Sequence, residues 1–125
     1  MNIFPDWPPN VIEEDKKIKN VITNYKGDIY LCGTKELRDD LIEHEKKHIE
    51  QQGDNHDAWL VRYQTDNDFM IDQEIEAYRV QLTFIEKTRG HADMLTATVS
   101  FAKFLSSEVY GNIITADEAL AKLQI

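Results

Sequence analysis

Two histidines four residues apart, with a glutamate directly after the first, form the most chemically suggestive pattern in the sequence, His44-Glu45-Lys46-Lys47-His48. Neutral imidazoles hold zinc well, and a zinc site for hydrolysis also needs an open position for water and a carboxylate nearby. On an α-helix, residues four apart lie about 40° apart around the axis and roughly 6 Å apart along it. His44 and His48 can therefore reach one ion, and Glu45 falls beside them, where it can accept a proton from water.

The motif is expected on a helix from about Lys35 to Gln52, which Thr34 caps and Gly53 ends. At roughly 100° per residue, the motif residues share one arc with the apolar side chains Leu37, Leu41, Ile42 and Ile49. The opposite arc is charged and holds Asp39, Asp40, Glu43, Lys46, Lys47 and Glu50. The motif is therefore predicted to face inward, where buried polar groups need compensation that a metal ion can supply.

A third ligand is expected on a second helix, from about Asn67 to Lys87, which stops at Gly90. Two glutamates of this helix could serve, and helical periodicity separates them. Glu74 lies in the middle of an apolar arc, whereas Glu76 lies on the far side of the helix. Glu74 is therefore the predicted ligand, with His56, eight residues after His48, as the alternative.

A HExxH motif followed on the next long helix by Glu-x-x-Ala (Glu74 to Ala77) resembles the gluzincin group of zinc metallopeptidases. It also resembles compact, single-domain metallopeptidases of bacteria and their phages. The resemblance covers residues 28 to 85 and implies that His44, His48 and Glu74 bind zinc while Glu45 acts as general base. The implied reaction is hydrolysis of a peptide or amide bond in a peptide or protein substrate.

The sequence departs from the gluzincin pattern at Tyr78, where several members have an aspartate that orients a metal ligand. Asp72 or Asp57 could supply that carboxylate instead. A neutral His91 or one of three tyrosines could polarise a substrate carbonyl, and the tyrosine candidates are Tyr63, Tyr78 and Tyr110.

The expected fold class is α+β and predominantly helical: a minimal zincin-like domain with a short strand before the motif helix. The strand is predicted over 28–32, between two glycines, and its edge near Ile29 to Leu31 could pair with an extended substrate. Apolar periodicity predicts helices over 11–26, 58–63 and 91–108, and a capping-box pattern from Thr115 to Glu118 opens a last one.

The length of 125 residues fits one domain, 1–125, in which residues 1–10 hold all three prolines and form an extended arm. Phe4 and Trp7 of this arm pack on the surface, cover a cleft or dock on a protein partner. A formal charge of −9 without a basic face excludes nucleic acid as a partner. No apolar run approaches the roughly 20 residues that span a bilayer, and the first residues do not form a secretory signal, so a cytoplasmic location is expected.

The same residues allow two other interpretations, of which the first is excluded and the second stays open. A di-iron site needs a second Glu-x-x-His motif, which the sequence does not contain. The chain could instead be a structural or interaction protein, for example a virion or assembly component, in which a metal only stabilises the fold. The single Cys32 is expected to pack as a small apolar side chain.

Overall fold

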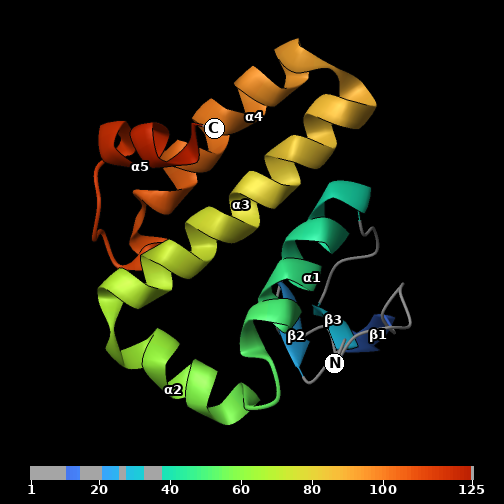
Figure 1. Cartoon of the computed structure of the whole chain (residues 1–125), viewed down its shortest axis with the longest axis vertical. Coiled ribbons are helices and arrows are strands. Elements are labelled where there is room, and N and C mark those ends of the chain that lie inside the picture. The colour runs from blue at the N-terminus through green and yellow to red at the C-terminus, as the bar shows by residue number, and fades with distance from the viewer. Residues whose placement is uncertain (1–10, 15–20, 26–27, 33–37, 125) are drawn as a thin grey trace.

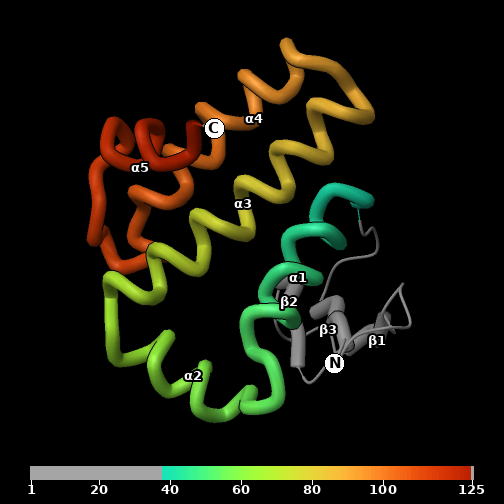
Figure 2. The backbone as a smooth tube through the Cα atoms, viewed as in Figure 1, coloured from blue at the N-terminus to red at the C-terminus, as the bar shows by residue number. Residues whose placement is uncertain are grey.

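The computed structural model describes the backbone of residues 11–14, 21–25, 28–32 and 38–124, and the side chains of residues 38–124. Its helices are α1 (Asp39–Gln52), α2 (His56–Thr65), α3 (Asn67–Arg89), α4 (His91–Leu105), the 3-10 turn η1 (Glu108–Tyr110) and α5 (Ala116–Leu123). Figure 1 shows α3 running through the middle of the molecule, with α1 along one side and α4 and α5 along the other. The tube in Figure 2 shows α2 closing one end between α1 and α3.

Local sequence explains where these helices begin and end. Asn55 and Asp66 cap α2 and α3 with side chains that accept backbone N–H groups of the first turn. Gly53 and Gly90 end α1 and α3 with positive φ angles of 57° and 100°, which glycine adopts without a Cβ clash. The predicted capping box is formed: Thr115 and Glu118 each accept a hydrogen bond from the other's backbone N–H.

The apolar core lies between α3, α4 and α5. Three leucines, one from each of these helices, are at most 1% exposed: Leu82, Leu105 and Leu123. Helix α1 packs against the other side of α3 and contributes Ile49, which is fully buried. Helix α3 is therefore buried on two sides, and a polar side chain on its α1 side lies inside the protein.

The predicted inward arcs of α1 and α3 are confirmed in most positions. On α3, all the apolar residues of the predicted arc are buried around Glu74, and Glu76 is exposed. On α1, the motif residues and Ile49 are buried. Asp40, which was predicted to lie on the charged outer arc, is only 1% exposed, so that prediction is wrong. It precedes His44 by one helical turn and therefore shares its face.

Three short strands precede α1: β1 (Val11–Glu14), β2 (Val21–Tyr25) and β3 (Asp28–Cys32). The central β3 pairs parallel to β1 and antiparallel to β2. The segment 28–32 therefore has a neighbour on both sides, and the expectation that it offers a free edge to a substrate is wrong. The helix predicted over 11–26 is also wrong, because both segments described there are strands.

The expected α+β class, a zincin-like domain with a strand element, is contradicted as well. From 38 to 124, the part of the chain whose side chains are described, the structure contains helices and no strand. The physical reason is that α1 and α3 cover each other's inward arcs, so the described core closes with helices alone.

Some predictions fall outside the described residues: the arm 1–10 with Phe4 and Trp7, the cap at Thr34, and the side chains of Leu37 and Cys32. Within the described part, no helix is both long and apolar enough to cross a membrane.

Candidate metal centre

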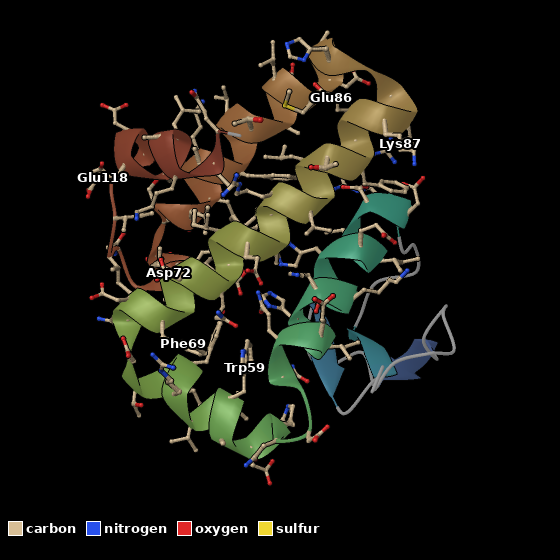
Figure 3. The ribbon with its side chains drawn as sticks, in the orientation of Figure 1. Trp59, Phe69, Asp72, Glu86, Lys87 and Glu118 are labelled. Carbon is tan, nitrogen blue, oxygen red and sulfur yellow. The ribbon has the colours of Figure 1, made fainter. Side chains whose placement is uncertain are left out.

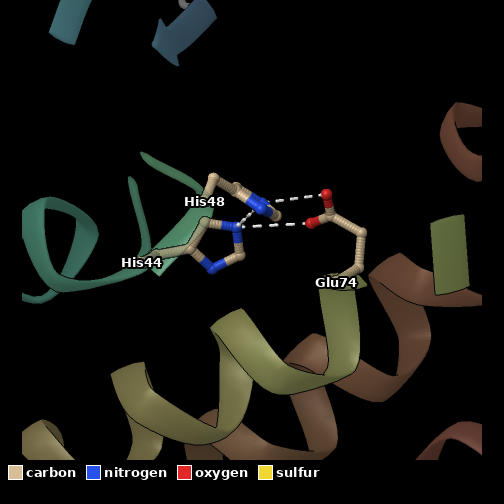
Figure 4. Close-up of side chains that lie close together, drawn as sticks. All are labelled: His44, His48 and Glu74. Carbon is tan, nitrogen blue, oxygen red and sulfur yellow. Dashed lines mark hydrogen bonds and ion pairs between the residues drawn. The ribbon is translucent and has the colours of Figure 1, made fainter. Parts of the chain in front are cut away.

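Three ligand atoms from α1 and α3 converge at one buried point (Figure 4). The Nε2 atoms of His44 and His48 are 3.1 Å apart, and they lie 3.3 and 3.0 Å from the two carboxylate oxygens of Glu74. All three residues are at most 5% exposed. The structure thus brings together the three residues predicted as ligands, and this group could bind a metal ion.

The other ring nitrogen of His44 is held by a chain of buried polar groups. Its Nδ1 lies 3.1 Å from the amide oxygen of Gln81, and the amide nitrogen of Gln81 donates to Asp40 over 2.6 Å. Asp40 is itself paired with the guanidinium groups of Arg38 and Arg89, at 3.1 and 3.5 Å. A carboxylate held by two cations can only accept here, so the amide nitrogen of Gln81 must face it. The amide oxygen then faces His44, and the Nδ1 of His44 must carry the proton.

His48 is held in the same manner by a second glutamine. Its Nδ1 lies 2.8 Å from the amide oxygen of Gln51. The amide nitrogen of Gln51 donates to the backbone carbonyl of Gln73 at 2.9 Å and to the carboxylate of Glu76 at 3.0 Å. Both of these groups only accept, so Gln51 is also fixed in orientation and the Nδ1 of His48 donates to it.

These two glutamine relays leave both Nε2 atoms as lone-pair acceptors that face each other and the carboxylate of Glu74. Three buried acceptors at such distances repel unless a cation or a proton lies among them. Without metal, a proton on His48 meets this need: burial disfavours the charged ring, but hydrogen bonding and attraction to Glu74 outweigh it and raise the pKa of His48 to about 9. Burial also opposes the charge on Glu74, and its bonds to His44 and His48 nevertheless hold its pKa well below the usual value.

Two tyrosines hold Glu74 from the side of α2 and η1. The hydroxyl of Tyr63 donates to its Oε2 over 2.7 Å, and that of Tyr110 donates to its Oε1 over 3.2 Å. Tyr78, four residues after Glu74, contacts the His44 ring edge-on with 4.4 Å between centroids. Burial, followed by the charge of Glu74, raises the pKa of Tyr63 and of Tyr110, so both hydroxyls stay protonated and act as donors.

Glu45 lies at the edge of the three candidate ligands without joining them. Its carboxylate is 3.9 Å from the Nε2 of His44, and its side chain is buried. It lines a cavity of about 240 Å³ together with the three ligands, Tyr63 and His56. His56 therefore lies near the centre, but it is not one of the three residues whose ligand atoms converge.

The remaining carboxylates and histidine proposed from the sequence lie elsewhere. Asp72 is exposed (Figure 3), and Asp57 is exposed and pairs with His56 instead of with His44, His48 or Glu74. The expectation that either carboxylate orients one of the three predicted ligands is therefore wrong. His91 is the first residue of α4 and pairs with Glu86, which Figure 3 places at the opposite end of the molecule from Trp59. Trp59 in turn packs against the ring of His48, with 5.7 Å between centroids.

The three residues that hold the Nδ1 side of the histidines, Gln81, Gln51 and Asp40, were not predicted from the sequence. A signal for two of them was present. Gln81 follows Glu74 by seven residues, which returns it to within about 20° of the same helix face. Asp40 precedes His44 by one turn on the face that the motif shares with apolar residues. Gln51 gave no such signal, because its role depends on Gln73 and Glu76 of another helix.

Comparison with known proteins assigns no family to the chain. No protein family model, no curated protein and no solved structure matches the chain.

Proposed function

We propose that the protein is a zinc-dependent hydrolase that cleaves peptide or amide bonds. The observation that carries this proposal is the pair of glutamine relays, which direct the Nε2 lone pairs of both histidines and the carboxylate of Glu74 at one point. Histidine nitrogen and carboxylate oxygen are ligands that zinc accepts, and three protein ligands leave a position open, as catalytic zinc sites require. The resemblance of the motif to gluzincins points in the same direction.

In this proposal His44, His48 and Glu74 hold the metal. When bound, zinc supplies Lewis acidity, which polarises a carbonyl oxygen and makes water a nucleophile near neutral pH. Glu45 lines the same cavity, so its carboxylate is placed to take the proton that the water loses and to pass it to the leaving amine. The Nδ1–H groups of the two histidines keep donating to the amide oxygens of Gln81 and Gln51, which keeps the rings oriented during these steps.

The first experiment measures bound metal and hydrolysis in the same preparations of the full chain. The native protein is compared with Glu74→Ala, with Glu45→Gln and with the control Glu86→Gln, an exposed glutamate of α3 that pairs with His91. We expect one zinc per chain in the native protein, in Glu45→Gln and in Glu86→Gln, and none in Glu74→Ala. Hydrolysis of a mixed peptide library should be lost in Glu45→Gln and retained in Glu86→Gln.

Each step of the proposal can fail separately in this experiment. Iron in place of zinc would favour another chemistry, because two histidines and one carboxylate also suit non-haem iron. Zinc retained in Glu74→Ala would exclude Glu74 as a ligand and turn attention to His56. Hydrolysis that persists in Glu45→Gln would exclude Glu45 as the base.

A stabilising metal without catalysis is the second candidate. The observation in its favour is that the ligands come from both α1 and α3, so that an ion would fasten these helices together. Under this alternative, metal removal would lower the free energy of unfolding, and neither the native protein nor Glu45→Gln would hydrolyse any peptide.

A further inference from the structure

A second, larger cavity opens beside the candidate metal centre. Its volume is about 710 Å³, and its wall includes His44, Glu45, Tyr63 and Tyr110, which also line the smaller cavity around the ligands. The two cavities therefore share one wall at the carboxylate proposed as the base. A group that fills the larger cavity must lie directly beside the reacting bond.

The rest of this cavity has a mostly apolar wall, in which the side-chain amides of Gln64 and Asn67 are the polar exceptions. Its main residues are apolar or aromatic: Leu41, Met70, Tyr78, Phe104, Val109 and Ile113. Glu45 is the only charged side chain among the described residues that line it. A charged group would exchange its hydration for contact with a mostly apolar wall, whereas an apolar group gains by leaving water.

Two of these apolar side chains remain exposed at the mouth of the cavity. Phe104 of α4 is 45% exposed and Val109 of η1 is 66% exposed. The turn η1 thus has two functions, because it brings the hydroxyl of Tyr110 to Glu74 and places the neighbouring Val109 at the mouth. Gly111, with a φ of +83°, allows the chain to turn directly after Tyr110.

We propose that this cavity, the apolar pocket, binds a bulky apolar side chain of the substrate, such as phenylalanine or leucine, next to the bond that is cleaved. The proposal rests on the proposed function, since it takes the metal centre as the place of reaction. A volume of about 710 Å³ exceeds the needs of a small side chain, and its apolar wall extends from α1 to η1. The protein then selects a peptide by the apolar residue at its cleavage site and not by the charge of that residue.

The test measures binding instead of turnover, with two metal-chelating probes of different size. Acetohydroxamic acid and 3-phenylpropanohydroxamic acid share the chelating group, and only the second carries an apolar arm. Their affinities for the zinc-loaded full chain are measured by calorimetry. We expect the phenyl compound to bind roughly 10- to 100-fold more tightly, because its ring leaves water in the apolar pocket.

Matched substitutions locate the source of this preference. Val109→Lys introduces a charge at the mouth of the pocket, and Val61→Lys introduces the same charge on α2 at a valine that is 60% exposed and does not line the pocket. Phe104→Ala and Leu95→Ala form a second pair on α4, with starting exposures of 45% and 51%. The preference for the phenyl compound should fall at least fivefold in Val109→Lys and Phe104→Ala, and should stay within twofold of native in the two controls.

The outcomes separate the pocket from the metal centre. Equal affinity of the two compounds for the native protein would refute the apolar pocket and leave the metal centre intact. Equal loss of preference in Val109→Lys and Val61→Lys would also refute it, because the effect would then not depend on location. Binding of neither compound would refute the proposed function itself, and the pocket assignment with it.

Discussion

Replacing Gln81 by leucine tests whether the relay from Asp40 orients His44. Leucine has a similar size and keeps the position apolar, but it removes the amide that lies between the His44 ring and the Asp40 carboxylate. Gln81 is fully buried, so no water from the surface replaces the lost partner. The Nδ1 proton of His44 loses its acceptor, and the ring is then free to rotate or to change tautomer.

The expected magnitude follows from these contacts. Loss of a partner that orients a metal-binding histidine lowers metal affinity about 10- to 100-fold, or about 1.4 to 2.7 kcal/mol. Leaving the buried Nδ1–H of His44 without an acceptor costs a further amount of about 1 to 3 kcal/mol in the free energy of unfolding. Asp40 loses less, because Arg38 and Arg89 still contact it.

The assay is a competitive zinc titration against a coloured chelator, combined with urea unfolding of the metal-free protein. The control is Thr98→Val, which removes a buried hydroxyl that donates to the Met94 carbonyl within α4, away from the metal centre. We expect Thr98→Val to lower stability without changing zinc affinity. Zinc affinity of Gln81→Leu within twofold of native would refute the relay, whatever the effect on stability.

Three further predictions concern protonation, the second anchor of Glu74 and the last helix. Because Glu74 outweighs burial and raises the pKa of His48 from 6.5 to about 9, the unfolding free energy of the metal-free protein should fall by about 3 kcal/mol as the pH rises from 6.5 to 9. Zinc competes with the proton on His48, so zinc affinity should instead rise roughly tenfold per pH unit over the same interval. Urea unfolding measures the first trend and zinc titration the second. If stability and zinc affinity changed in the same direction with pH, the assignment of this proton to His48 would be wrong. Tyr63→Phe removes the 2.7 Å hydrogen bond to Glu74 and should weaken zinc binding by roughly 3- to 30-fold with α2 intact by circular dichroism; unchanged affinity would show that Glu74 needs no such anchor. Thr115→Ala removes the cap of α5 and should cost about 1 kcal/mol in urea unfolding while zinc affinity stays the same, whereas a change in affinity would connect α5 to the metal centre.

Patterns within single helices were sufficient to predict part of the candidate metal centre from the sequence. The spacing of His44 and His48 and the choice of Glu74 over Glu76 depend only on the geometry of one helix and the apolar residues beside it. Helices α3 and α5 each begin where a capping side chain can reach the backbone of the first turn, and α3 ends at the glycine that follows its last turn. These features are local, so the sequence carries them without knowledge of the rest of the fold.

Only the tertiary structure decided how the histidines are oriented and which layer closes the core. The relay to His44 joins Asp40 and Gln81, which are 41 residues apart, and the cavity beside Glu45 is completed by η1, more than sixty residues further along the chain. The segment around 11–26 has apolar residues at helical spacing and nevertheless contains two strands, because pairing with β3 outweighs a weak periodicity. Partner choice across such distances depends on how α1, α3 and α4 pack, and no local pattern in the sequence specifies that packing.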